Sequence, residues 1–409
     1  MRVLPWFVLC VSLSSAIATA PRAAETAPAA ISESPSLIQG RTLDEWREVM
    51  KSLDLKSPEA ATEVPGLLEI VSDDRVPWFT RRQAALTLGR IGAPAARAIP
   101  LLEQYAAAPA RSDDTSASLW AVKSLALYGR VAAPATPTLA RLVTDSATDP
   151  AIRLMSVEAL CRIGTAHPLA LATVVNLLRS HEPCLSPEQR RTGAERELVV
   201  ACIESLELFQ GDAESSVPIL LRYSEDREDR VRRAVAVTLG AIGPRASDAG
   251  PRLAVMTLSD RSHDVRDVAA IALGKIGGTE WLVRILSHSD PDTRERAATA
   301  LGFVPGRDVA TKSALANARA DESPLVRISA IEATERWHSD PQLTAPAAAQ
   351  ELAAPDRHVR IRAVRFLTKL GLKAAPAIPI LEQLRNHAEL QVRQSADKLL
   401  ESIEAQGLK

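Results

Sequence analysis

The sequence has 409 residues, of which 46% are hydrophobic and only 3% are aromatic. Its 49 basic residues are balanced by 50 acidic ones, so the net charge of −1 gives no general attraction to phosphate and no nucleic-acid partner is expected, although a local basic stripe is compatible with it. The scarcity of aromatic residues argues against a β-sandwich and favours a core of Ala, Leu, Val and Ile between close helices.

The first residues have the pattern of an export signal. Arg2 precedes an uncharged apolar segment that runs from Trp6 to Ile17. Small residues at Ala16 and Ala18 place the expected cleavage after Ala18, which gives a signal peptide over residues 1–18 and an exported protein, periplasmic or secreted. The alternative is an uncleaved membrane anchor, but the segment is shorter than the about 20 residues of a spanning helix. We therefore expect no membrane span after signal removal.

The next two segments prepare a repeat array. Residues 19–40 are rich in Ala, Pro, Ser and Glu and lack a periodic apolar face, so a disordered tether is expected. Thr42 and Glu45 then form a capping-box pattern that starts a helix with Trp46 and Met50 on its apolar face. Residues 41–60 are therefore predicted to be an N-terminal capping helix, and residues 61–409 the array itself.

One segment, from Arg81 to Gly92, returns along most of the chain. The equivalents of Gly92 are Ala132, Gly164, Gln210, Gly243, Gly277, Pro305, His338 and Gly371. The last three stand 33 residues apart, and a period of this size indicates stacked helical hairpins. The longest interval lies between Gly164 and Gln210, where a Pro- and charge-rich loop is inserted at about residues 180–193, off the array.

Each half of the repeat reads as a helix. From Val231 to Ile242 the apolar residues recur with a period of 3.6, and Gly243 is a stop signal. Pro recurs where the next helix would start, for example at Pro251. Because one hairpin cannot bury its apolar face alone, the predicted fold is all-α, an α-α superhelix (α-solenoid) of about ten helical hairpins.

An Arg series recurs at one position of the repeat. Its members are Arg81, Arg153, Arg232, Arg266, Arg294, Arg327, Arg360 and Arg393. They could line one surface and bind acidic partners, or they could bond turn carboxylates or carbonyls between neighbouring layers. We favour the structural interpretation, because Asp229, Asp264, Asp292 and Asp356 lie in the turns just before four of them.

These residues also carry a family resemblance. The pattern Val-Arg-x-x-Ala-x-x-x-Leu-Gly-x-Ile-Gly, followed by Ile-Pro-x-Leu, resembles HEAT repeats and, more narrowly, the HEAT-like repeats of phycobilisome lyases. The resemblance implies an armadillo-like α-solenoid over roughly residues 60–403. It implies little about function, because such repeats serve many unrelated systems.

Candidate sites for chemistry are few. The sequence contains no zinc-protease, nucleophile-elbow, phosphate-loop or dinucleotide motif, so no catalytic residue, cofactor or metal site is predicted. His181 and Cys184 are a weak candidate pair of zinc ligands. A disulfide could join Cys184 to Cys202 or to Cys161, or these cysteines could be small buried residues.

Four tryptophans, Trp78, Trp120, Trp281 and Trp337, are expected to pack at layer edges, unless one side of the array presents several of them as interface anchors. Three functions are compatible with the sequence. The first is an exported, non-catalytic scaffold that binds a protein or peptide on an extended concave surface. The second is an enzyme-maturation factor or lyase-like protein related to bilin lyases. A bound chromophore, seen by the absorption of the purified protein, would support this function. The third is an envelope-structural or assembly component, which fractionation would find attached.

Overall fold

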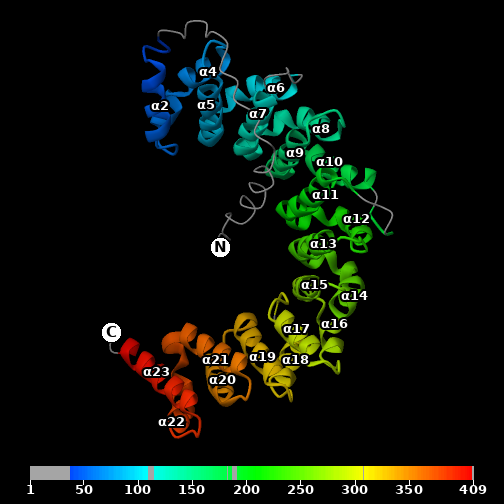
Figure 1. Cartoon of the computed structure of the whole chain (residues 1–409), viewed down its shortest axis with the longest axis vertical. Helices are drawn as coiled ribbons and strands as arrows, with labels where there is room; N and C mark the ends of the chain where they lie inside the picture. The colour runs from blue at the N-terminus through cyan, green and yellow to red at the C-terminus, as the bar shows by residue number, and fades with distance from the viewer. Residues whose placement is uncertain (1–36, 109–114, 182, 187–190, 307, 408–409) are drawn as a thin grey trace. The chain divides into compact units, whose positions relative to one another are not determined.

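The computed structural model describes residues 37–108, 115–181, 183–186, 191–306 and 308–407. The expected signal peptide (1–18), its cleavage after Ala18 and most of the expected tether (19–40) lie outside these residues. The described chain is helical, and its one β-type feature is an isolated bridge between Ile38 and Arg41. No helix in this described part is both long and apolar enough to cross a membrane. The chain divides into unit 1 (residues 1–177 and 193–201) and unit 2 (residues 178–192 and 202–409). Figure 1 labels the helices of both.

Unit 1 carries the first helical hairpins. Its helices are α2 (Leu43–Ser52), α3 (Glu59–Thr62), α4 (Val64–Ser72), α5 (Trp78–Ile91), α6 (Ile99–Ala107), α7 (Thr115–Tyr128), α8 (Thr136–Thr144) and α9 (Pro150–Ile163), with 3-10 segments η1 (Ala93–Ala98), η2 (Gly129–Ala135) and η3 (Gly164–Ala166). Helices α5, α7 and α9 pack side by side in one layer, and α4, α6 and α8 each pack on the helix that follows them. Helices α10 (Pro168–Ser180) and α11 (Gly193–Ser205) belong partly to each unit.

Unit 2 continues the same pattern. Its helices are α12 (Val217–Tyr223), α13 (Asp229–Ile242), α14 (Gly250–Ser259), α15 (His263–Lys275), α16 (Thr279–Ile285), α17 (Pro291–Leu301), α18 (Val309–Ala318), α19 (Pro324–Trp337), α20 (Pro341–Gln350), α21 (Arg357–Leu370), α22 (Ile378–Leu384) and α23 (Leu390–Gly407), with 3-10 segments η4 (Leu206–Ser216), η5 (Gly243–Ala249), η6 (Glu351–Ala353) and η7 (Gly371–Ala377). The helices α13, α15, α17, α19, α21 and α23 pack in succession and form what we call the odd-numbered layer of unit 2. The helices α14, α16 and α18, and then α20 and α22, pack in the other layer (Figure 1).

The repeat has the local structure that its residues predict. Helix α13 ends at Ile242, and Gly243 follows with φ 72°, a conformation that residues with a side chain rarely adopt. The short segment η5 then leads into α14, where Pro251 lies in the first turn and leaves no backbone donor unpaired. These features confirm the predicted helix over residues 231–242 and the stop that follows it.

At Gln210 the aligned position is correct although Gly is missing there, whereas the turn predicted at Pro305 falls at Gly306 and His338 has an extended backbone. Gln210 has φ 48° and ψ −131°, close to the φ 56° and ψ −127° of Gly371 at the same place in its own repeat. The alignment is wrong in the second repeat. There the left-handed turn falls at Gly129, with φ 55°, and not at Ala132, which is buried inside η2. The chain therefore turns three residues earlier than predicted.

The N-terminal helix α2 begins with the predicted capping box. The Glu45 amide donates to the Thr42 hydroxyl at 3.3 Å, and the Thr42 amide donates to the Glu45 carboxylate at 2.7 Å. The Trp46 side chain is 1% exposed, and its indole N–H donates to the Ile38 carbonyl at 2.8 Å. Helix α2 packs on α5 and so covers the first hairpin of unit 1.

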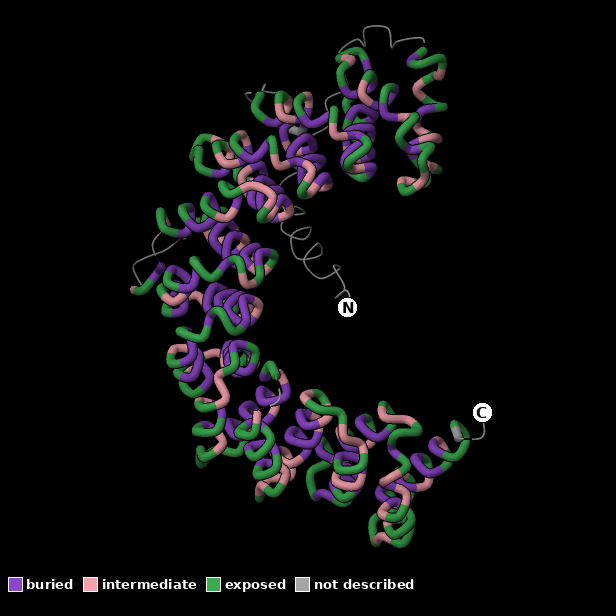
Figure 2. The backbone as a smooth tube through the Cα atoms, turned by 180° about the vertical axis from the view of Figure 1, so that it is seen from behind, coloured by how far each residue is buried: buried purple, intermediate pink, exposed green. Residues whose placement is uncertain are grey.

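The core of each unit lies between its helices, as Figure 2 shows by the buried positions on the facing sides of neighbouring hairpins. The C-terminal hairpins share one cluster that joins buried residues from Ile328 to Ile403. Small residues set the spacing of the odd-numbered layer, because a side chain at Gly274 of α15 would collide with the Ala300 carbonyl of α17. The described chain is thus an all-α solenoid of stacked helical hairpins, which confirms the predicted fold class.

Candidate binding groove beside the inserted loop

The Arg series is used inside the array. Arg232 of α13 donates from Nε and Nη2 to the two carboxylate oxygens of Asp260, at 2.7 and 2.8 Å, and from Nη1 to the carbonyls of Asp226 and Arg227, at 2.9 and 3.0 Å. Arg294 repeats this arrangement with Asp321, and Arg327 repeats it with Glu351. In all three cases the carboxylate lies after the following helix and so belongs to the connection into the next repeat.

The other members of the series bind groups of the fold as well. Arg266, Arg360, Arg393 and Arg153 donate to backbone carbonyls, and Arg81 pairs with Asp74. The aspartates expected as partners form no ion pair with the series among the described residues: Asp264, for example, pairs with the exposed Arg233. Burial raises the pKa of Asp260, but hydrogen bonds from Arg232 and from the Ser262 amide outweigh it, so the pKa lies below its usual value. The series therefore connects repeats and offers no free row of cations.

The inserted loop is held against the array by one buried carboxylate. Asp226, which is 1% exposed, accepts hydrogen bonds from the Cys184 amide at 2.9 Å, from Arg191 Nη2 at 2.8 Å and from the Glu228 amide at 3.0 Å. The Arg227 amide donates in return to the Cys184 carbonyl at 2.6 Å. The described part of the loop thus lies against the turn before α13, and the expectation of a loop off the array is wrong for these residues.

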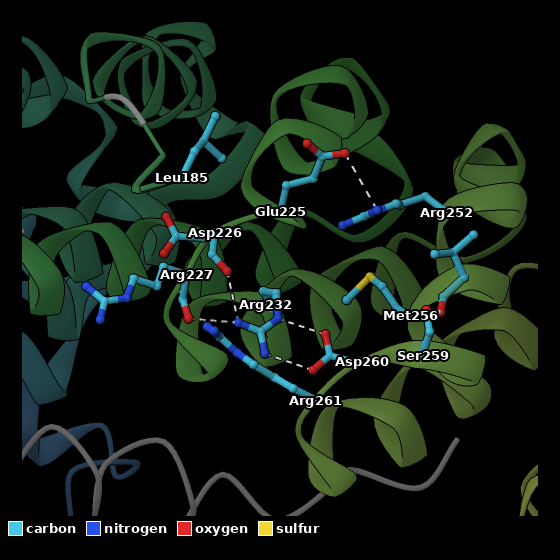
Figure 3. A pocket seen from close by; sticks show the side chains of 11 residues that line it. Leu185, Glu225, Asp226, Arg227, Arg232, Arg252, Met256, Ser259, Asp260 and Arg261 are labelled. Atoms are coloured by element: carbon cyan, nitrogen blue, oxygen red, sulfur yellow. Dashed lines mark hydrogen bonds and ion pairs between the residues drawn. The ribbon is translucent and has the colours of Figure 1, made fainter. Parts of the chain in front are cut away.

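A groove of about 430 Å³ lies where this loop meets α13 and α14. We call it the loop groove (Figure 3). Leu185 of the loop is 61% exposed, Val255 of α14 is 49% exposed, and both line the groove together with the buried Met256. These side chains give the loop groove an open apolar wall that the fold itself does not cover.

The charged groups of the loop groove differ in how far the fold uses them. Asp226 and Asp260 are bound as described above, and Arg252 donates to the hydroxyl and carbonyl of Ser224 at 2.7 and 2.8 Å and lies 3.6 Å from Glu225. Arg261 is exposed and makes no ion pair or hydrogen bond with the described residues. The lining residues include no His, Cys or Lys, so the groove can bind an apolar and acidic group but contains no nucleophile paired with a base.

The cysteines of the array are buried. Cys184 is a free thiol and is 6% exposed, so the candidate disulfide between Cys184 and Cys202 is not formed, and the alternative of small buried residues describes Cys161 on α9 and Cys202 on α11. Burial raises the pKa of the Cys184 thiol. Among the described residues, which exclude Glu182, no group of three or more metal-ligating side chains occurs around His181 or elsewhere.

The four tryptophans differ in exposure. Trp120 is 3% exposed and packs against Tyr105, with ring centroids 5.2 Å apart. Trp281 and Trp337 are half-buried, whereas Trp78 is 50% exposed beside the 44% exposed Phe79. The packing interpretation thus describes Trp120 well and Trp78 poorly. Sequence reasoning missed Phe79, Leu185, Val255 and Arg261, because nothing in the period marks them.

A HEAT-repeat family model matches residues 188–274 and 250–335, across the hairpins that carry the loop groove. The matched region, residues 188–335, thus consists of HEAT repeats, and the described chain is an α-solenoid of stacked helical hairpins. No curated protein matches the chain.

Several solved structures are similar to the chain. Importin beta is 13% identical, with a TM-score of 0.47, over 89% of this chain and 55% of its own length. Kap95p, in a structure with RanGDP, is 12% identical, with a TM-score of 0.41, and the match covers 88% of this chain and 57% of Kap95p. One chain of the CpcE–CpcF complex of phycocyanin lyase from Nostoc sp. PCC7120 is 20% identical, with a TM-score of 0.33, and the match covers 66% of this chain and 94% of that one. None reaches a TM-score of 0.5, so the narrower resemblance to phycobilisome lyases stays a prediction.

Proposed function

We propose that the protein is an exported, non-catalytic scaffold that binds a protein or peptide partner, and that the loop groove is its principal docking site. The observation that carries the proposal is the pairing of two exposed apolar side chains, Leu185 and Val255, with an exposed cation, Arg261, that forms no ion pair with the described residues. A partner with an apolar side chain next to a carboxylate would fit this combination.

The position of the groove supports this function. Insertions into repeat arrays gather at loops on one face, which is often the binding face. Here the insertion lies at the longest interval of the array, and Asp226 holds Cys184, the residue next to Leu185, in place before a partner arrives. A pre-ordered anchor loses less entropy on binding than a mobile one, so the same contacts give tighter binding.

A comparison of variants tests the docking site. The full chain, Leu185→Ser/Val255→Ser and Leu258→Ser serve as baits in extracts of the compartment to which the protein is exported. Leu258 is the matched control, because it is 43% exposed on the same helix α14 but does not line the loop groove. We expect the same partner to be retained by the full chain and by the control, and to be lost from the double variant. Equal retention by all three, or no retained partner, contradicts the proposal.

Export through residues 1–18 is a separate part of the proposal, motivated by the apolar segment from Trp6 to Ile17 and the small residues Ala16 and Ala18. N-terminal sequencing of the protein from cells is expected to begin at Thr19 in the exported fraction. Recovery only of the chain that begins with Met1, inside the cell, would exclude export by this signal.

A further inference from the structure

A second groove opens on the odd-numbered layer of unit 2, between α19 and α21, and has a volume of about 530 Å³. We call it the basic groove. Its charged lining residues are two acids and four cations: Glu332, Glu335, Arg336, Arg365, Lys369 and Lys373. Because the whole chain carries a net charge of −1, this excess of positive charge is a local feature.

Both acids of the basic groove are already bound by the fold. Glu332 accepts from Arg362 Nη2 at 2.8 Å. Glu335 accepts from the Asp340 amide at 3.1 Å and from the Thr344 hydroxyl at 2.8 Å, and so holds the turn into α20. Neither carboxylate forms an ion pair with the described cations that line the groove beside it.

The cations remain available. Arg365, Lys369 and Lys373 are exposed and make no ion pair or hydrogen bond with the described residues. Arg365 and Lys369 are four residues apart and so lie on one face of α21, and Lys373 follows in η7. The guanidinium of Arg336 lies over the ring of Phe303, 4.5 Å from its centre, and has no acidic partner in the described chain.

Several other cations of the odd-numbered layer are paired with a neighbouring repeat, as in Arg233 with Asp264, Arg296 with Asp267 and Arg362 with Glu332, whereas no ion pair is found for Arg365, Lys369 or Lys373 among the described residues. The helix dipole gives a structural reason for Lys369, which lies in the last turn of α21. It gives none for Arg365 in the middle of the helix, or for Lys373 beyond its end.

We infer that the basic groove binds an acidic peptide segment of a partner protein, with its carboxylates on Arg365, Lys369 and Lys373 and an apolar side chain against Leu370. Phe366, at 9% exposure, offers no open ring on which a nucleic-acid base could stack, so the groove favours a peptide over an oligonucleotide. The inference concerns a site apart from the loop groove and stands or fails independently of it.

The test measures fluorescence anisotropy of a short labelled peptide that alternates Glu with Leu, titrated with the full chain at low and at physiological salt. We expect salt-sensitive binding that Arg365→Glu/Lys369→Glu weakens by at least about tenfold, since two attractive charges become repulsive. Lys312→Glu, an exposed charge reversal on α18 away from the groove, is the matched control and should bind like the full chain. Far-UV dichroism and thermal unfolding verify that each variant is folded, and Lys373→Glu alone replaces the double variant if it is not.

Several results would overturn the inference. The first two are no binding of the peptide by the full chain, and equal binding of the peptide by the groove variant and the control. The next two are equally tight binding of a peptide with Lys in place of Glu, and stronger competition for the labelled peptide by a single-stranded oligonucleotide than by unlabelled peptide. Displacement by inorganic phosphate at the concentration at which unlabelled acidic peptide displaces would identify a simple anion site and would also overturn the peptide assignment.

Discussion

Arg232 and Asp260, from two consecutive repeats, form a bidentate ion pair in which each side chain is 6% exposed. The carbonyl of the same Asp260 accepts from Arg266 of the next repeat. Asp321 is held in the same way, by Arg294 at its carboxylate and by Arg327 at its carbonyl. One turn residue is thus bound by the arginines on both sides of it, and the repeats are connected by polar as well as apolar contacts.

The first prediction concerns this ion pair. Arg232→Met should lower the free energy of unfolding by about 3–5 kcal/mol, because it leaves a buried carboxylate without its charged partner and two carbonyls without the donor that Arg232 supplies. The neighbouring Arg233→Met removes a pair whose side chains are 47% and 64% exposed, and should cost at most about 1 kcal/mol. Urea denaturation of both variants measures the difference. Similar midpoints for the two variants would contradict the structural role of the series.

The second prediction concerns the carboxylate that holds the inserted loop. Asp226→Ala removes the acceptor of the Cys184 amide and of Arg191, so the loop should open more often and expose the Cys184 thiol. We expect the thiol to react with Ellman's reagent at least about tenfold faster, which corresponds to about 1.4 kcal/mol of easier opening. Glu225→Ala, an exposed neighbour, should leave the rate unchanged. An unchanged rate in Asp226→Ala as well would show that other contacts hold the loop.

The third prediction is a pH dependence that originates from Glu207 in η4. Burial, aided by repulsion from Glu204, raises its pKa from 4.5 to about 7, against the attraction of Lys275 and Arg233. Between these two values the folded chain keeps a proton that the unfolded chain releases, so stability falls as the pH rises through this window and then stays level.

Glu207→Gln removes this ionisation. The variant should be more stable than the natural chain by about 1–3 kcal/mol above about pH 8, and the difference should vanish toward about pH 4. Urea denaturation across this range measures it. Glu214→Gln, exposed in the same segment, is the control and should follow the natural chain. A constant difference between Glu207→Gln and the natural chain at all pH values would exclude Glu207 as the titrating group.

The fourth prediction concerns the close approach of α15 and α17. Gly274→Ala gains helix propensity, but its methyl group would collide with the Ala300 carbonyl, so the two helices must separate. We expect a net loss of about 1–3 kcal/mol in the free energy of unfolding. Gly193→Ala, where the added methyl group meets open space, should be neutral or slightly stabilising. Thermal unfolding distinguishes the two, and a stabilised Gly274→Ala would contradict the packing argument.

The sequence predicted the fold well because the repeat determines local structure. Gln210 illustrates this: its position in the period predicted the turn, and the structure gives it the left-handed conformation of Gly in spite of its side chain. The second repeat shows the limit. Its alignment placed the turn at Ala132, whereas the residue with positive φ is Gly129, three positions earlier.

The sites were harder to predict, because partners across the array are not periodic in the sequence. The aspartates expected to bind the Arg series were the nearest along the chain, whereas the real partners, such as Asp260 for Arg232, follow one helix later. The loop groove requires Leu185 and Val255, which lie far apart in the sequence, to meet. The excess of cations around Arg365 is visible in the sequence only as a basic helix, and their lack of partners emerges from the three-dimensional contacts alone.

Asp260 and Asp321 are each bound by arginines of two consecutive repeats, and this arrangement constrains how repeats can be added or lost in evolution. A duplication of one whole period copies both an arginine and the acidic residue that pairs with the arginine of the preceding repeat. The junctions of the lengthened protein therefore keep their ion pairs. A deletion that ends within a period would instead remove the acidic residue and leave the buried guanidinium of the arginine without its partner. We therefore expect natural length variants to differ by whole periods.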